Sequence, residues 1–139
     1  MLEWMEEYAT GVQLVDIQHR ALIQQINRLE AMTKAEQVDP AEVGRLVGFL
    51  GNYIVSHFKF EENCMKRRSC PAYQANKQAH DQFVVEWTQF KVQYDSEGAD
   101  QELLQKLLER TQAWIKHHIL KIDLQLKDSV TGVRDWNLA

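Results

Sequence analysis

Apolar residues recur every three or four positions through four long stretches of this 139-residue chain, and that spacing is the strongest constraint on its fold. Such spacing is typical of amphipathic helices, whereas the apolar residues of half-buried strands alternate. Two prolines and six glycines in the whole chain leave these stretches almost uninterrupted. The chain is therefore predicted to be all-α, with a length that suits one domain around a single core.

Start and stop signals divide the pattern into four predicted helices. Asp39 before Pro40 is a typical helix start, Asp100 is a second capping residue, and Pro71 disfavours helix at the residue before it. The predicted helices cover about 16 to 37, 40 to 64, 72 to 94 and 101 to 127.

Short connections between long helices favour antiparallel neighbours, so the predicted architecture is an up-down-up-down four-helix bundle. The apolar segment before Asp16 is predicted to be an N-terminal arm that covers part of the bundle. Residues 1–139 form a single predicted domain, in which helical periodicity gives way to a tail or linker from about residue 128.

Composition and charge exclude several classes of partner. The formal net charge is −4 and the only local basic cluster is 66–68, so nucleic acid is not an expected partner. No apolar stretch has the length of a membrane span, and the first ten residues lack a secretory signal pattern. A cytoplasmic protein with no membrane partner is expected. Cys64 and Cys70 lack a C-x-x-C motif and are expected to be free thiols.

Histidines and carboxylates interrupt the predicted inward stripes of all four helices. On the second helix, for example, His57 and Glu61 are one turn apart on the same face. A lone buried histidine is common, but burying several with carboxylates is costly unless another charge compensates. The residues on or beside the stripes are His19, His57, Glu61, His80, His118 and Asp123.

A bound cation removes that cost, and donors rich in nitrogen favour a transition metal over calcium or magnesium. Iron, manganese and zinc are the candidates, as one ion or two. The chain lacks the Glu-x-x-His motif of the carboxylate-rich di-iron bundles. Its nitrogen-rich set favours the lower oxidation state of the metal and reversible oxygen binding over substrate oxidation.

Successive motifs resemble those of the hemerythrin family, especially the bacteriohemerythrins, over nearly the whole chain and in the family's order. They are Trp4 and Tyr8 before GVQLVDIQHR, then HFKFEE, then Tyr73 to His80 with Phe83, then WIKHHILKID. The resemblance implies two iron ions, as Fe²⁺ or Fe³⁺, joined by an oxo or hydroxo group. The implied ligands are His19 and His57 for one iron, His80 and His118 for the other, and Glu61 with Asp123 as bridges.

By the same resemblance, dioxygen binds at the iron with an open position, inside an apolar oxygen pocket. Phe58, Trp114, Ile115 and Ile119 would form this pocket, although the same residues equally suit an ordinary bundle core. His117 falls off the inward stripe and is not counted as a ligand.

One position departs from the family pattern, because Asn76 stands where the family has a histidine four residues before His80. Asn76 can bind metal weakly through its side-chain oxygen, hold a water in the vacated position, or leave that iron labile and the site mononuclear. A water-filled or open position is the favoured interpretation.

The favoured function is a non-haem di-iron oxygen or redox sensor, which is not itself an enzyme and feeds a fused signalling output domain such as a diguanylate cyclase. Asn76 favours this function because an open position predicts faster oxidation of the oxygenated protein. A stand-alone oxygen carrier or storage protein is the main alternative. A di-iron enzyme, with peroxide or nitric oxide as further ligands, and a metal-free helical interaction module are the remaining ones.

Overall fold

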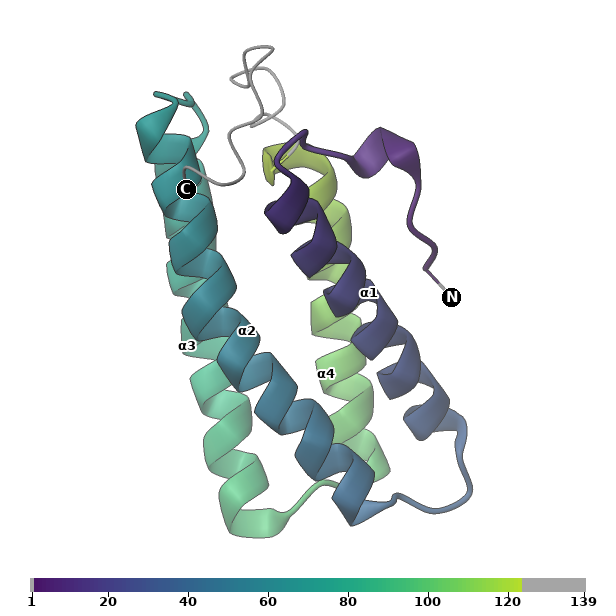
Figure 1. The fold of residues 1–139 in the computed structure, drawn as a ribbon. Helices are drawn as coiled ribbons and strands as arrows, with labels where there is room; N and C mark the ends of the chain where they lie inside the picture. The colour runs from purple at the N-terminus through teal and green to yellow at the C-terminus, as the bar shows by residue number, and fades with distance from the viewer. Residues whose placement is uncertain (1, 124–139) are drawn as a thin grey trace.

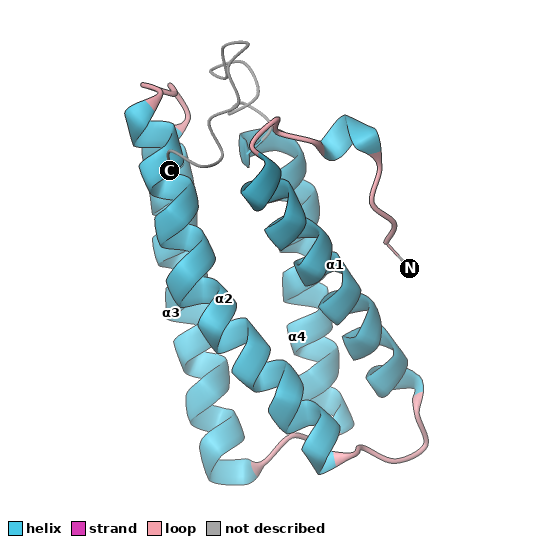
Figure 2. Ribbon diagram, viewed as in Figure 1, coloured by secondary structure: helices cyan, strands magenta, loops and turns pink. Residues whose placement is uncertain are grey.

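The computed structural model describes the backbone of residues 2–123 and the side chains of residues 2–119, which form a bundle of four long helices (Figure 1, Figure 2). The helices are α1 (Gln13–Lys34), α2 (Pro40–Arg67), α3 (Tyr73–Glu97) and α4 (Gln101–Trp114). No strand occurs in this described range. The all-α prediction is confirmed.

Successive helices alternate in direction, so α1 and α3 run one way along the bundle and α2 and α4 the other (Figure 1). α1 packs against α2 and α4, and α3 packs against α2. This arrangement confirms the predicted antiparallel up-down-up-down bundle. Among the described helices, none combines the length and the apolar character that crossing a bilayer requires.

Side-chain caps define where two of the helices begin. The Asp39 carboxylate accepts a hydrogen bond from the Ala41 N–H at 3.0 Å, with Pro40 in the first turn of α2. The Asp100 carboxylate accepts one from the Leu103 N–H at 2.8 Å. Each cap satisfies a backbone donor that the first helical turn leaves unpaired, and both predicted caps are confirmed.

The other helix ends differ from the predicted ones. α1 begins earlier, at Gln13, and ends at Lys34. α2 continues past residue 64 to Arg67, because basic side chains in its last turn suit the negative end of the helix dipole. α3 also runs further than predicted, to Glu97.

The last part of the fourth helix was predicted to be α-helical, and that prediction is wrong. The α-helix stops at Trp114 and continues as a π-helix over Ile115–Asp123, and the predicted residues 124 to 127 lie outside the described part. π-Helices are rare, and they occur frequently at functional sites. The π-helical segment also packs against α3.

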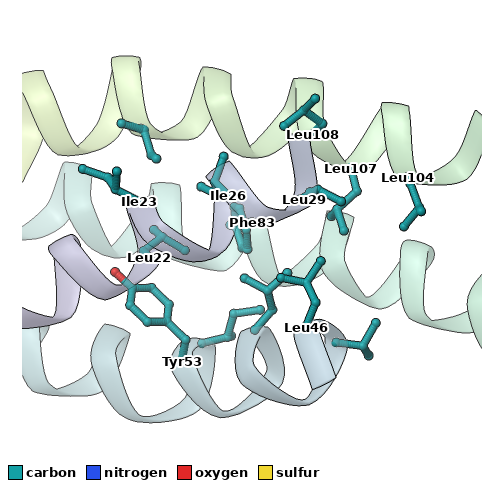
Figure 3. Close-up of a cluster of buried hydrophobic side chains, with 14 of the residues drawn as sticks. Leu22, Ile23, Ile26, Leu29, Leu46, Tyr53, Phe83, Leu104, Leu107 and Leu108 are labelled. Carbon is teal, nitrogen blue, oxygen red and sulfur yellow. The ribbon is translucent and has the colours of Figure 1, made fainter. Parts of the chain in front are cut away.

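The apolar core fills the space between the helices (Figure 3). Its labelled members come from all four helices and are Leu22, Ile23, Ile26, Leu29, Leu46, Tyr53, Phe83, Leu104, Leu107 and Leu108. Val84 of α3 is 39% exposed although its neighbour Phe83 is buried. α3 thus turns only a narrow face to its neighbours.

The N-terminal arm lies along the bundle, as predicted. The Asn27 side chain of α1 holds Leu2 by two hydrogen bonds, to its N–H at 3.0 Å and to its carbonyl at 2.7 Å. Leu2 and Trp4 pack on the core, and the Arg20 guanidinium lies 4.7 Å from the centre of the Trp4 ring. Met5, in contrast, is exposed.

A smaller apolar cluster contains both cysteines, which are buried and, as predicted, are thiols rather than a disulfide. Burial raises the pKa of the Cys64 thiol, against the opposing effect of Arg68. Cys64 is therefore a neutral packing residue at physiological pH.

Candidate metal centre

Glu61 of α2 is completely buried in a group of four histidines, each supplied by a different part of the bundle. His19 comes from α1, His57 from α2, His80 from α3 and His118 from the π-helical segment. None of the five residues is more than 2% exposed. The structure thus brings together five of the six predicted metal-binding residues.

The two oxygens of Glu61 face different pairs of histidines. Oε2 lies 3.1 Å from His19 Nε2 and 3.5 Å from His57 Nε2. Oε1 lies 3.2 Å from His80 Nε2 and 3.8 Å from His118 Nε2. A carboxylate with this division of contacts has the geometry of a bridge between two cations.

The spacing of the donor atoms suits metal ions. Nitrogen ligands about 2.1 Å from a shared ion lie about 3 Å apart when they occupy adjacent positions. The Nε2 atoms of His80 and His118 are 3.1 Å apart. The donors form two groups that share Glu61, one with His19 and His57 and the other with His80 and His118. Within each group the ligand atoms lie within 4.8 Å of one another. The donor set therefore fits one ion on the His19 and His57 side and another on the His80 and His118 side.

Gln18 and Glu62, which were not predicted to belong to the site, contact histidine rings at Nδ1, on the side away from Glu61. Gln18 Oε1 pairs with His57 Nδ1, and Glu62 Oε2 lies 2.8 Å from His80 Nδ1. Because both partners accept hydrogen bonds through oxygen, they keep a proton on Nδ1, so that Nε2 is the nitrogen that would bind a metal ion. The only sequence signals were the position of Gln18 beside one histidine and the paired glutamates of HFKFEE.

The charge of the site favours an ionised carboxylate. Burial by itself raises the pKa of Glu61, but the charge on His57 and hydrogen bonds from His118, His19 and His57 together hold that pKa well below its ordinary value. A buried carboxylate among imidazoles requires positive charge nearby, as protons or as metal ions.

Asn76 lies inside the site and is completely buried. Its Nδ2 donates to Glu61 Oε1 at 2.9 Å and to the Met65 sulfur at 3.2 Å. Its Oδ1 is buried without a hydrogen-bond partner among the described residues. Asn76 thus contacts the Glu61 carboxylate that the four histidines share.

Aromatic rings pack against the histidines on one side of the site. Phe58 stacks on His80 with ring centres 3.9 Å apart, and Trp114 stacks on His118 at the same separation. Phe58, Ile115 and Ile119 are buried and belong to the main core cluster, against which Trp114 packs. These four predicted pocket residues form an apolar wall, and their role toward oxygen stays a prediction.

The sixth predicted ligand, Asp123, is the last residue of the π-helical segment, and its side chain lies outside the described part. Hydrogen bonds in a π-helix join residues five apart, so positions 118 and 123 are about one turn apart there, whereas an α-helix separates them. An α-helix over these positions would place Asp123 only beside the inward stripe, as predicted from the sequence. His117 is exposed, as predicted.

A four-helix bundle that buries histidines from every helix around one shared carboxylate defines a class of helical metal-binding proteins. A model of the hemerythrin HHE cation binding domain matches residues 10–129 of this chain. The chain therefore belongs to the hemerythrin family, whose domains bind non-haem iron and dioxygen.

Named relatives agree with this assignment. The bacteriohemerythrin of Stenotrophomonas maltophilia is 28% identical over 130 residues, which cover 94% of this chain and 82% of that protein. A Pseudomonas aeruginosa bacteriohemerythrin is 28% identical over 129 residues, covering 93% of this chain and 81% of the relative. The Clostridium acetobutylicum bacteriohemerythrin is 27% identical over 130 residues, covering 92% and 100%.

Proposed function

We propose that this domain holds two iron ions and binds dioxygen reversibly, as the oxygen or redox sensor of a signalling protein, without being an enzyme itself. The observation that carries the proposal is the division of contacts at Glu61, whose two oxygens face two separate histidine pairs. When bound, the irons supply the electrons and the coordination position that reversible oxygen binding needs.

The protein residues of the proposed centre have separate tasks. His19 and His57 would hold one iron, His80 and His118 the other, and Glu61 with Asp123 would bridge them beside an oxo or hydroxo group. A nitrogen-rich donor set of this kind supports the lower oxidation state of the metal.

The apolar wall would protect the centre from water and protons. Phe58 and Trp114 stack on the histidines of one side, and the two isoleucines, Ile115 and Ile119, are each 1% exposed. Excluding water slows the side reactions by which bound oxygen oxidises iron irreversibly. The wall therefore supports oxygen binding over turnover of a substrate.

Asn76 supports the choice of sensor over carrier. It replaces a nitrogen ligand on the side of His80 and His118, and its amide nitrogen is engaged with Glu61 Oε1. The iron on that side would have an open or water-filled position and would be oxidised more readily in the presence of oxygen. Such a change of redox state is useful as a signal and harmful in storage.

Metal analysis together with absorption spectra tests the proposal. The iron-loaded protein is measured oxidised, reduced, and reduced then exposed to oxygen. We expect two irons per chain, oxo-bridge bands in the oxidised form and new bands that appear with oxygen and disappear on its removal. One iron, zinc or no metal per chain would overturn the di-iron proposal.

A stand-alone oxygen carrier is the second candidate, and the apolar wall is the observation that favours it. The lifetime of the oxygenated protein separates the two functions. A lifetime of many hours favours the carrier, whereas oxidation within minutes favours the sensor.

A further inference from the structure

We infer that Glu62 and Gln18 are positioning residues that make the two metal positions unequal, with Glu62 strengthening the position on the side of His80. The inference rests on the proposed metal centre and concerns residues outside its ligand set. The two groups that contact Nδ1 of His57 and of His80 differ in charge, because one is an amide and the other a carboxylate.

His80 lies between two successive carboxylates of α2. Glu61 Oε1 is 3.2 Å from its Nε2, and Glu62 Oε2 is 2.8 Å from its Nδ1. The Glu62 side chain is only 21% exposed, so water weakens this hydrogen bond less than it would at the surface. Both nitrogens of the ring thus lie against carboxylates, which fix the orientation of the ring and make Nδ1 a donor to Glu62.

His57 has a neutral partner in the same role. Gln18 of α1 accepts the hydrogen bond from His57 Nδ1 through its amide oxygen. The amide orients the ring and fixes its tautomer, but it brings no charge.

A carboxylate that accepts a hydrogen bond from Nδ1 of an imidazole makes Nε2 a stronger ligand for a metal ion than a neutral amide in the same place does. A metal ion on the His80 side is therefore bound more tightly through His80, and its higher oxidation state is stabilised more. That is also the side on which Asn76 stands in place of a nitrogen ligand. Glu62 thus compensates in part for the missing donor.

The substitution Glu62→Gln tests this by removing the charge while keeping an oxygen that accepts from His80. We expect it to weaken metal binding at one of the two positions by roughly 10–100-fold, with faster release to a chelator of that ion alone. The reduction potential of that position should rise, since each tenfold change in relative affinity for the two oxidation states corresponds to about 59 mV.

Glu86→Gln is the matched control, because it makes the same change at a side chain of similar exposure, 28%, whose partner is Arg110 at 2.7 Å. It should release both ions as the unchanged protein does. Gln18→Glu is the reverse experiment and should slow release from the His57 side.

Release is measured with Fe²⁺ and, separately, with Co²⁺. Unchanged release and potential in Glu62→Gln, from a protein that holds two ions, would overturn the inference and leave the proposed function standing. A protein that takes up no iron would overturn the proposed function, while release of Co²⁺ still decides the role of Glu62.

Discussion

Asn76 is the residue at which the predicted ligand set lacks a nitrogen donor, and the structure shows which contacts its side chain makes. Its amide nitrogen donates to Glu61 Oε1 and to the Met65 sulfur. An amide nitrogen has no lone pair free to bind a metal, so in this orientation Asn76 stabilises the carboxylate rather than the ion.

Asn76→His should add a nitrogen ligand on the side of His80 and His118. We expect iron binding there to tighten by roughly tenfold or more, the scale on which even outer partners act. We also expect the oxygenated protein to oxidise more slowly, which is followed by its absorption against time. Asn76→Ala is the control that removes the amide without adding a ligand. An oxidation rate unchanged by the histidine would contradict the role assigned to this position.

Glu61 should affect the acid stability of the metal-free protein. Its pKa is lowered on folding, so the ionised carboxylate stabilises the folded state above its ordinary pKa of 4.5, and this stabilisation is lost as the pH falls through the lower folded pKa. The free energy of unfolding should therefore differ most from that of Glu61→Gln at neutral pH. Denaturant titrations between pH 7 and pH 3 should show the difference shrinking below pH 4.5. A difference independent of pH would contradict this assignment of charge.

At the scale of the element, α2 supplies two of the five site residues, His57 and Glu61, and carries glycines within its length. A methyl group added at Gly48 meets nothing within 4 Å, and the position is exposed. The end of α3 is different, because Gly98 has φ +76° and ψ −178° and donates its N–H to the Tyr94 carbonyl at 2.9 Å. Only glycine adopts that backbone conformation without strain.

Alanine should therefore have opposite effects at the two glycines. Gly48→Ala should stabilise the protein by about 0.5–1 kcal/mol, because alanine loses less backbone entropy in a helix. Gly98→Ala should destabilise it by about 1–3 kcal/mol through backbone strain. Chemical denaturation of both variants measures the two effects, and a change of the same sign in both would show that the helix environment has been misjudged.

The change from α-helix to π-helix after Trp114 is a second feature of the helices that affects the site. It alters the register of the segment that carries His118 and Asp123 without changing the sequence spacing. Residues five apart, which an α-helix turns to different faces, return to nearly the same face in a π-helix.

Across the whole molecule, the site joins all four helices through one buried carboxylate. Desolvation of the buried imidazoles and of Glu61 opposes folding, and a bound cation offsets that cost. Ions that bind only the folded protein should therefore stabilise the entire bundle.

Metal removal should lower the melting temperature. At a free metal concentration about 100 times the dissociation constant, binding contributes about 2.7 kcal/mol, which corresponds to roughly 10 °C for a domain of this size. Calorimetry of the metal-free and iron-loaded forms measures this difference in melting temperature. The difference should increase with the metal concentration, because the metal binds only the folded protein. Equal melting temperatures of the two forms would favour a helical module that binds no metal.

The periodicity of the chain was sufficient to predict the helices, their antiparallel order and five residues that meet in the site, because local spacing determines which face of a helix is buried. The exposure of Val84 was not predictable in this way, since it depends on how closely α3 meets its neighbours.

Three features were decided only by the tertiary structure: the contacts of Gln18 and Glu62 with ligand histidines, the donation from Asn76 to Glu61, and the π-helical register after Trp114. Each depends on distances between residues far apart in the chain or on a choice between two helix types. Spacing along the sequence therefore determined which side chains enter the core. Packing determined which atoms of those side chains face one another, because hydrogen bonds and metal ligands require positions accurate to a fraction of an ångström.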